Sequence, residues 1–110
     1  MIRITFYENG HHEYEGFDVT GHSGYADSGE DIICSAVSML VINTINSIEM
    51  FTDDETSCVS NEDNGSIVFR IGAGSSHDAL LLIRSMILGL ESLEDNEEYD
   101  PYIDIIFEEV

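Results

Sequence analysis

Residues 21–38 read GHSGYADSGEDIICSAVS, a glycine-rich segment that leads directly into a helical pattern. Its three glycines indicate a loop that lasts to Asp31. From Ile32 onward, apolar residues recur at spacings of three and four, which predicts an amphipathic helix that ends near Phe51. The predicted core face of this helix consists of Ile33, Val37, Leu40, Val41, Thr44, Ile45 and Ile48.

The chain upstream of this segment has the pattern of a β-hairpin. Residues 1–8 alternate between apolar and polar side chains, which is typical of a half-buried strand. Asn9-Gly10 is a strong hairpin turn signal, and a return strand is predicted over residues 12–20. The alternation of this second strand slips by one residue around Gly16, which predicts a bulge or bend.

A second hairpin and a second helix are predicted downstream. The two strands are expected at residues 55–60 and 66–71, and the helix from Asp78 to about Leu93, capped by Ser75 or Ser76. The helix is apolar on nearly every side, which indicates burial between layers or at a subunit interface. Its main apolar set is Ala79, Ile83, Met86, Ile87 and Leu90.

A final strand is predicted at residues 102–109, so the order of elements is ββ-α-ββ-α-β. Because hairpins dominate this order, we predict an α+β fold in which a mainly antiparallel sheet packs against two long helices. No linker, repeat or low-complexity segment divides the 110 residues, and we expect one domain over 1–110.

The chain is strongly acidic. Three Lys+Arg stand against 23 Asp+Glu, a formal net charge of −20, which disfavours nucleic acid as a partner and favours basic proteins. An equally simple interpretation is solubility or a salt-adapted proteome. The amino terminus lacks a basic and apolar signal pattern, and residues 32–51 are interrupted by polar side chains, so we expect a cytoplasmic protein without a membrane span.

His22 and Cys34 lie at the two ends of the loop. The sequence places Cys34 in the first turn of a helix, where the helix dipole favours thiolate over thiol, and His22 can act as its general base. Backbone N–H groups near Cys34 can stabilise an oxyanion. Asp31 either orients the imidazole or serves the helix start, and Cys34 itself has the alternative of being a small buried apolar residue.

Other candidate sites are weaker. Cys58 lies in a polar strand with no histidine nearby, and we interpret it as structural; a redox pair with Cys34 would need the two to come within disulfide reach. His11-His12 has no spaced partner for a metal. Residues 72–75 resemble an anion-binding turn, but they lack a phosphate-loop lysine and lie among acidic residues, so a simple helix entry is favoured.

With these residues in view, the block at 21–26 and 29–38 resembles the signature of the ribosomal-processing cysteine protease family, Prp, and the resemblance covers essentially the whole chain. It implies a protease that removes a short amino-terminal extension from large-subunit ribosomal protein twenty-seven. Transferred to this sequence, Cys34 is the nucleophile, His22 the base and Gly21 the hinge of a mobile loop. Asp31 and Ser38 are motif positions of supporting role.

The resemblance further implies a homodimer, no cofactor, no metal, and the precursor of that ribosomal protein as peptide substrate. We expect an extended peptide to dock beside a sheet edge, with pockets for its aromatic side chains. Substrate is expected to order the loop over the site. The alternative hypothesis is a non-catalytic module that binds basic ribosomal proteins through its acidic surface. Cleavage that disappears in Cys34→Ala supports the first, and salt-sensitive binding that survives this substitution supports the second.

Overall fold

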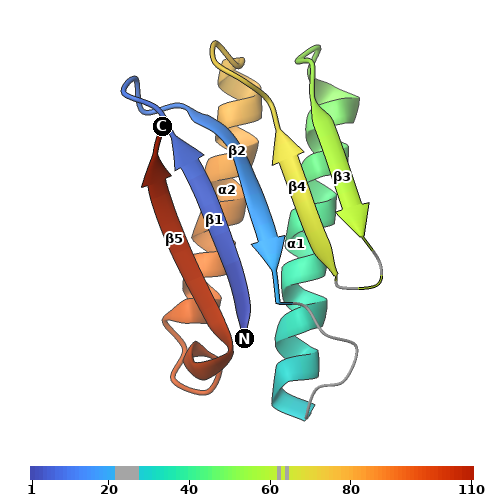
Figure 1. Cartoon of the computed structure of the whole chain (residues 1–110), viewed down its shortest axis with the longest axis vertical. Coiled ribbons are helices and arrows are strands. Elements are labelled where there is room, and N and C mark those ends of the chain that lie inside the picture. The colour runs from blue at the N-terminus through green and yellow to red at the C-terminus, as the bar shows by residue number, and fades with distance from the viewer. Residues whose placement is uncertain (22–27, 62, 64) are drawn as a thin grey trace.

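The computed structural model describes residues 1–21, 28–61, 63 and 65–110, with the side chains of residues 28–31 left out. Five strands form one sheet in the order β3-β4-β2-β1-β5, and both helices lie on the same face of it (Figure 1). The elements are β1 (Ile2–Glu8), β2 (Tyr14–Thr20), α1 (Ser28–Phe51), β3 (Ser57–Asn61), β4 (Ser66–Arg70), α2 (His77–Glu94), a 3₁₀ turn (Asp100–Tyr102) and β5 (Ile103–Glu109). All neighbouring strands are antiparallel except β1 and β5, which are parallel. The predicted α+β class and order of elements are confirmed.

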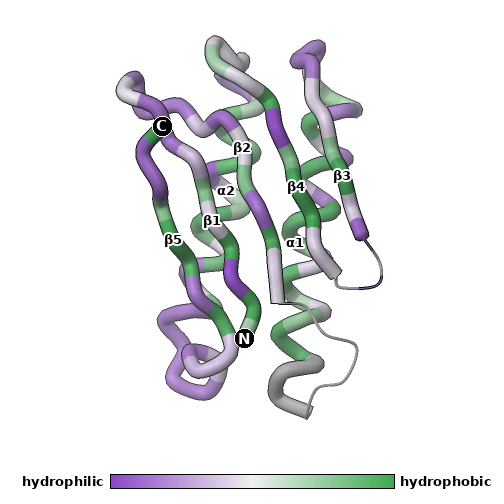
Figure 2. Tube along the Cα trace, viewed as in Figure 1, coloured by the Kyte–Doolittle hydropathy of each residue, from purple (hydrophilic) through white to green (hydrophobic). Residues whose placement is uncertain are grey.

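The core lies between the sheet and the helices. Phe6, Phe17 and Phe69 occupy neighbouring positions on β1, β2 and β4, and all three side chains are fully buried. Their ring centroids are 5.7 Å and 5.0 Å apart along this row. Strand alternation places the polar residues between them on the opposite face, and the colours along β1 alternate accordingly in Figure 2. This second face carries no helix (Figure 1).

Both helices bury the faces that the sequence predicts. On α2 the buried set is the predicted one: Ala79, Ile83, Met86, Ile87 and Leu90. On α1 all predicted core residues are buried except Leu40, which is partly buried. Leu81 and Leu88 of α2 are exposed, so this helix is buried along one stripe rather than on nearly every side.

The start of α1 differs from the prediction. The helix begins at Ser28, four residues before the predicted start at Ile32, and Cys34 is its seventh residue. The prediction that Cys34 lies in the first turn is therefore wrong, because the loop pattern of Gly29 hid an additional helical turn. The predicted end at Phe51 is confirmed, and the bulge predicted near Gly16 is present, where Tyr7 pairs with Gly16 but Glu8 pairs with Tyr14.

The apolar character of α1 comes from its place in the core. By length and composition alone, residues Ile32–Phe51 would suffice to cross a membrane, with a mean hydropathy of 1.5. A core helix meets the same criterion, and Val37, Val41 and Ile48 of this stretch are buried with the sheet residues in one cluster.

Candidate active site

Gly21 ends the hairpin and leads into the segment that carries His22. Its φ of +82° lies in the left-handed region that favours glycine. A Cβ at this position would collide with the backbone carbonyl oxygen of Met1, at the neighbouring end of β1. Only glycine therefore fits this turn without moving the backbone. This is a local reason for the glycine at the position predicted to be a hinge; His22 itself lies outside the described residues.

Cys34 faces the interior of the molecule. Its side chain is 6% exposed and belongs to the core cluster, in the second turn of α1. The helix dipole acts mainly within the first turn, so its influence on this thiol is smaller than the sequence suggested. The helix alone therefore offers this thiol less activation than a first-turn position would. The side chain of Asp31, like His22, lies outside the described residues.

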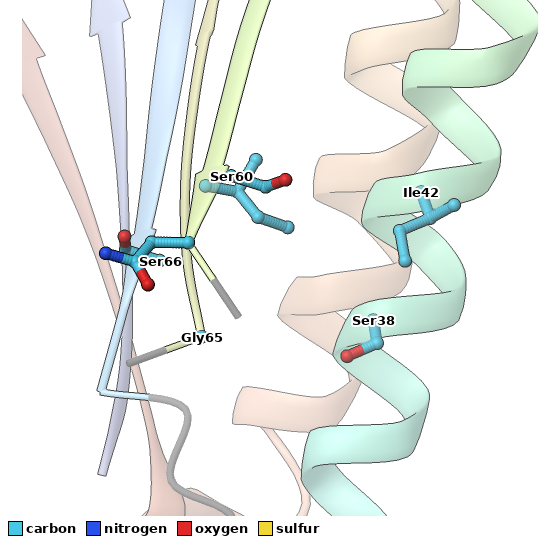
Figure 3. A pocket seen from close by; sticks show the side chains of 7 residues that line it. Ser38, Ile42, Ser60, Gly65 and Ser66 are labelled. Carbon is cyan, nitrogen blue, oxygen red and sulfur yellow. The ribbon is translucent and has the colours of Figure 1, made fainter. Parts of the chain in front are cut away.

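A cavity begins one helical turn beyond Cys34. Ser38 follows Cys34 by four residues on α1 and is half-buried. With Ile42 it forms one wall, and β3, β4 and their connection form the other, as Figure 3 shows for Ser60 and Ser66. The cavity has a volume of about 330 Å³, and its lining consists of Ser38, Ile42, Ser60, Asn61, Gly65, Ser66 and Ile67.

A second, smaller cavity continues along the same helix. It measures about 180 Å³ and shares Ile42, Ser60 and Ile67 with the first. Ile45, Asn46 and Cys58 complete its lining. Together the two cavities form a groove between α1 and the β3–β4 hairpin, which we call the α1–β3 groove. Among the described residues, its lining consists of apolar and small polar side chains and includes no charged one.

The second cysteine lies in this groove and is chemically different from Cys34. Cys58 is exposed on β3, and both cysteines are thiols. Partial burial raises the pKa of the Cys58 thiol, and the nearby carboxylate of Glu49 raises it further. The raised pKa disfavours the Cys58 thiolate at neutral pH, which makes this thiol a poor nucleophile.

The remaining sequence candidates have structural roles. Among the described residues, no group of three or more His, Cys, Asp or Glu side chains gathers as a metal site. Gly72 and Gly74 both have positive φ, so the turn at 72–75 is a chain reversal. The Ser76 hydroxyl accepts a hydrogen bond from the N–H of Ala79 at 3.1 Å and caps α2, which decides between the two predicted caps.

The comparisons with known proteins agree with this arrangement. The family model of cysteine protease Prp matches residues 1–104. The chain belongs to the cysteine protease Prp family. The ribosomal processing cysteine protease Prp of Bacillus subtilis is 29% identical over 98 residues, which cover 86% of this chain and 88% of that protein. The Staphylococcus aureus protein of the same name is 23% identical, with 94% and 95% covered.

Solved structures show the same fold. SMU.848 from Streptococcus mutans superposes with a TM-score of 0.88 at 27% identity, covering 100% of this chain and 99% of that one. The Staphylococcus aureus Prp in complex with a substrate peptide has a TM-score of 0.89 at 21% identity, covering 98% and 100%. This chain is therefore a cysteine protease of the ribosomal-processing family.

The sequence pattern does not predict the α1–β3 groove. It identifies Ser38 as a motif position and places Ile67 on the core side of its strand, but it assigns Ile42 to no face. Pairing of β4 with β2, which lies far away in sequence, decides that this hairpin stands across from α1. A sequence pattern of period two carries no information on that pairing.

Proposed function

We propose that this protein is an endopeptidase that removes the amino-terminal extension of large-subunit ribosomal protein twenty-seven. Membership of the Prp family, together with a groove that begins one helical turn beyond Cys34, carries the proposal. Cys34 is the nucleophile and His22 the general base. Gly21, Asp31 and Ser38 support the site, Gly21 through its left-handed turn and Ser38 through its place at the groove.

The chemistry proceeds in two steps. The thiol proton of Cys34 passes to His22, and the sulfur attacks the carbonyl carbon of the scissile peptide bond. The same proton then goes to the leaving amine as the bond breaks, which leaves a thioester on Cys34. Water hydrolyses this thioester and regenerates the thiol. No cofactor or metal takes part in this scheme.

The α1–β3 groove supplies a binding place for substrate side chains next to the reaction. Its uncharged lining with Ile42 and Ile67 suits apolar or aromatic side chains, and its polar atoms come from serines and an asparagine. A largely apolar site with a few polar groups is the usual composition of a ligand pocket. The groove starts one helical turn from Cys34, so a peptide whose apolar residues occupy it brings a neighbouring peptide bond close to the thiol.

The test is cleavage of a synthetic peptide spanning the extension, followed by mass spectrometry. Wild-type protein should make one cut, and Cys34→Ala and His22→Ala should make none. Cys58→Ala is the matched control, since it removes a thiol from the groove and leaves the proposed nucleophile in place. Cleavage by Cys34→Ala would overturn the assignment, and salt-sensitive binding without any cut would favour the non-catalytic module.

The groove has its own test. Ile42→Asp places a carboxylate in the groove and should raise KM for the peptide roughly tenfold or more. The reason is that an apolar substrate side chain entering the groove would displace water from this carboxylate, which is costly. Met50→Asp is the control on the same helix, since Met50 is 76% exposed and lines neither cavity. Equal effects of the two substitutions would exclude the groove as the binding place.

We further propose that the protein is a homodimer that joins through the helix-free face of the sheet. This open face holds Arg3 and Arg70, two of the three cations of the chain, with Asp18, Asp104 and Glu108. Counting Glu15, which lines a pocket with Tyr7 and Arg70, this face has two cations and four carboxylates, a net charge of −2, against −20 for the whole chain. The exposed Val59 and Val68 add apolar surface. Two copies therefore meet here with the least repulsion.

Arg70 is held in place on the open face by Asp18 and Tyr7. Arg70 donates a 2.8 Å hydrogen bond to the carboxylate of Asp18, and its guanidinium lies 4.7 Å from the ring centroid of Tyr7. The hydroxyl of Tyr7 donates a 2.6 Å hydrogen bond to the same carboxylate. Sedimentation velocity tests the assignment: Val68→Glu should give monomers, and Leu88→Glu on α2 should leave the dimer intact. Monomers of Leu88→Glu together with dimers of Val68→Glu would instead place the interface on α2.

A cytoplasmic location and a single protease domain over residues 1–110 complete the proposal. The intended partner is a basic ribosomal protein, which the negative charge of this chain attracts. Nucleic acid and membranes are not proposed as partners.

A further inference from the structure

Among the described residues, no strand pairs with the outer edge of β3, and this strand lacks the usual protection of an edge strand. β3 ends the sheet, all five of its residues are exposed, and its pairing with β4 runs without a bulge. Its sequence, SCVSN, contains no charge and no proline. Natural edge strands usually carry such devices because unpaired N–H and C=O groups bind other extended chains.

The opposite edge of the same sheet shows the contrast. β5 carries Asp104, Glu108 and Glu109 among its seven residues. The protein therefore protects one edge with carboxylates and leaves the other uncharged, although 24% of its residues are charged. This asymmetry indicates that pairing at β3 is used.

The surroundings of β3 define what can pair there. The exposed carboxylates of Asp53 and Glu55 precede the strand, and Asp63 follows it, so acidic groups flank an uncharged strand. The helix side of β3 carries Cys58 and Ser60, which line the α1–β3 groove. Alternate side chains of an added strand would fall at the mouth of this groove.

We propose that an extended segment of the substrate adds to the free edge of β3 as a sixth strand. The segment that fits is uncharged in its middle, with apolar side chains at alternate positions, and is flanked by basic residues. Backbone hydrogen bonds to β3 supply affinity, and the α1–β3 groove binds the apolar side chains of the segment. The flanking carboxylates attract its basic ends. This inference rests on the proposed proteolysis of a basic ribosomal protein.

A second copy of the chain is the competing occupant, and charge disfavours it. Pairing β3 with β3 would bring Asp53, Glu55 and Asp63 of both copies to the same edge. Like charges placed together destabilise such pairing. A basic segment turns the same groups into favourable partners.

Amide hydrogen exchange in the Cys34→Ala protein tests the proposal. The probe is the extension peptide, lengthened to include the first basic residues of the mature ribosomal protein. Saturating peptide should slow exchange at those amides of residues 57–61 whose N–H points away from β4 by roughly tenfold or more, as new ladder hydrogen bonds form. Unchanged exchange there with bound peptide would overturn strand addition, as would protection that grows with protein concentration in the absence of peptide.

Matched charge variants separate local contacts from the general field. The triple variant Asp53→Asn, Glu55→Gln, Asp63→Asn should raise KM roughly three- to tenfold at low salt with kcat unchanged. The control Glu91→Gln, Glu97→Gln, Glu98→Gln removes three exposed carboxylates far from β3 along the chain and should change KM less than about twofold. Equal effects would contradict the proposal. Slowed hydrogen exchange requires peptide binding but no cleavage. A peptide that binds but that the wild-type protein does not cut would therefore contradict the proposed function and leave strand addition standing.

Discussion

A side chain at Gly21 would carry two physical costs, a left-handed backbone conformation and a steric collision. Alanine substitutions at four glycines measure these two costs separately. Gly10 has neither a positive φ nor a neighbour within 4 Å of an added Cβ. Gly74 has a φ of +76° and open space around its Cβ position. Gly16 lacks the positive φ, but an added Cβ would collide with the carbonyl oxygen of Phe69. Gly21 has both the positive φ and the collision with Met1.

The expected losses follow from these environments. Gly10→Ala should be neutral or slightly stabilising, because alanine lowers the entropy of the unfolded chain by about 0.4–1 kcal/mol. The left-handed conformation costs an alanine about 1–2 kcal/mol, so Gly74→Ala should lose about 1 kcal/mol net. Gly16→Ala should lose about 1–3 kcal/mol, the usual range for overpacking. Gly21→Ala should lose about 2–4 kcal/mol, the largest of the four.

Urea unfolding monitored by circular dichroism measures these free energies, with Cys34→Ala as the common background. A loss at Gly21 no larger than at Gly74 would refute the argument, because it would mean that β1 yields to the added methyl group without cost. For activity, Gly21→Ala should lower kcat/KM more than Gly16→Ala even where both are folded, since Gly21 directly precedes His22.

Three further outcomes are expected. Asp18→Asn should lower the free energy of unfolding at pH 7 by about 1 kcal/mol, a value that already allows for partial solvent screening. Burial acts to raise the pKa of the Asp18 carboxyl, but hydrogen bonds from Arg70 and Tyr7 outweigh burial and lower this pKa. This stabilisation is present above about pH 4 and disappears as pH falls through the lowered value, so unfolding curves of the two proteins should converge in acid. Ser76→Ala should cost about 1 kcal/mol through loss of the α2 cap, as seen by thermal unfolding. Ser75→Ala is its control and should be neutral or stabilising, because the buried Ser75 hydroxyl has no hydrogen-bond partner among the described residues.

The elements of the fold follow from local pattern, and their assembly does not. Ile33, Val37 and Val41 identify the buried face of α1 because helical spacing is a local property. The Asn9-Gly10 turn likewise identifies the first hairpin. The parallel pairing of β1 with β5 joins residues about a hundred positions apart, and no local signal reports it. The α1–β3 groove depends on the same kind of long-range pairing, so its lining was not predictable.

The corrected start of α1 changes the argument for the chemistry of Cys34. A cysteine in the first turn has partial activation from the helix itself, and loss of its base would leave some reactivity. Cys34 is the seventh residue of the helix, where the dipole offers little stabilisation of the thiolate. The proposed mechanism therefore depends more strongly on His22, because its imidazole has to supply most of the activation of the Cys34 thiol. Alkylation of Cys34 near pH 7 should accordingly be far slower in His22→Ala than in wild type, and equal rates would assign the activation to some other group.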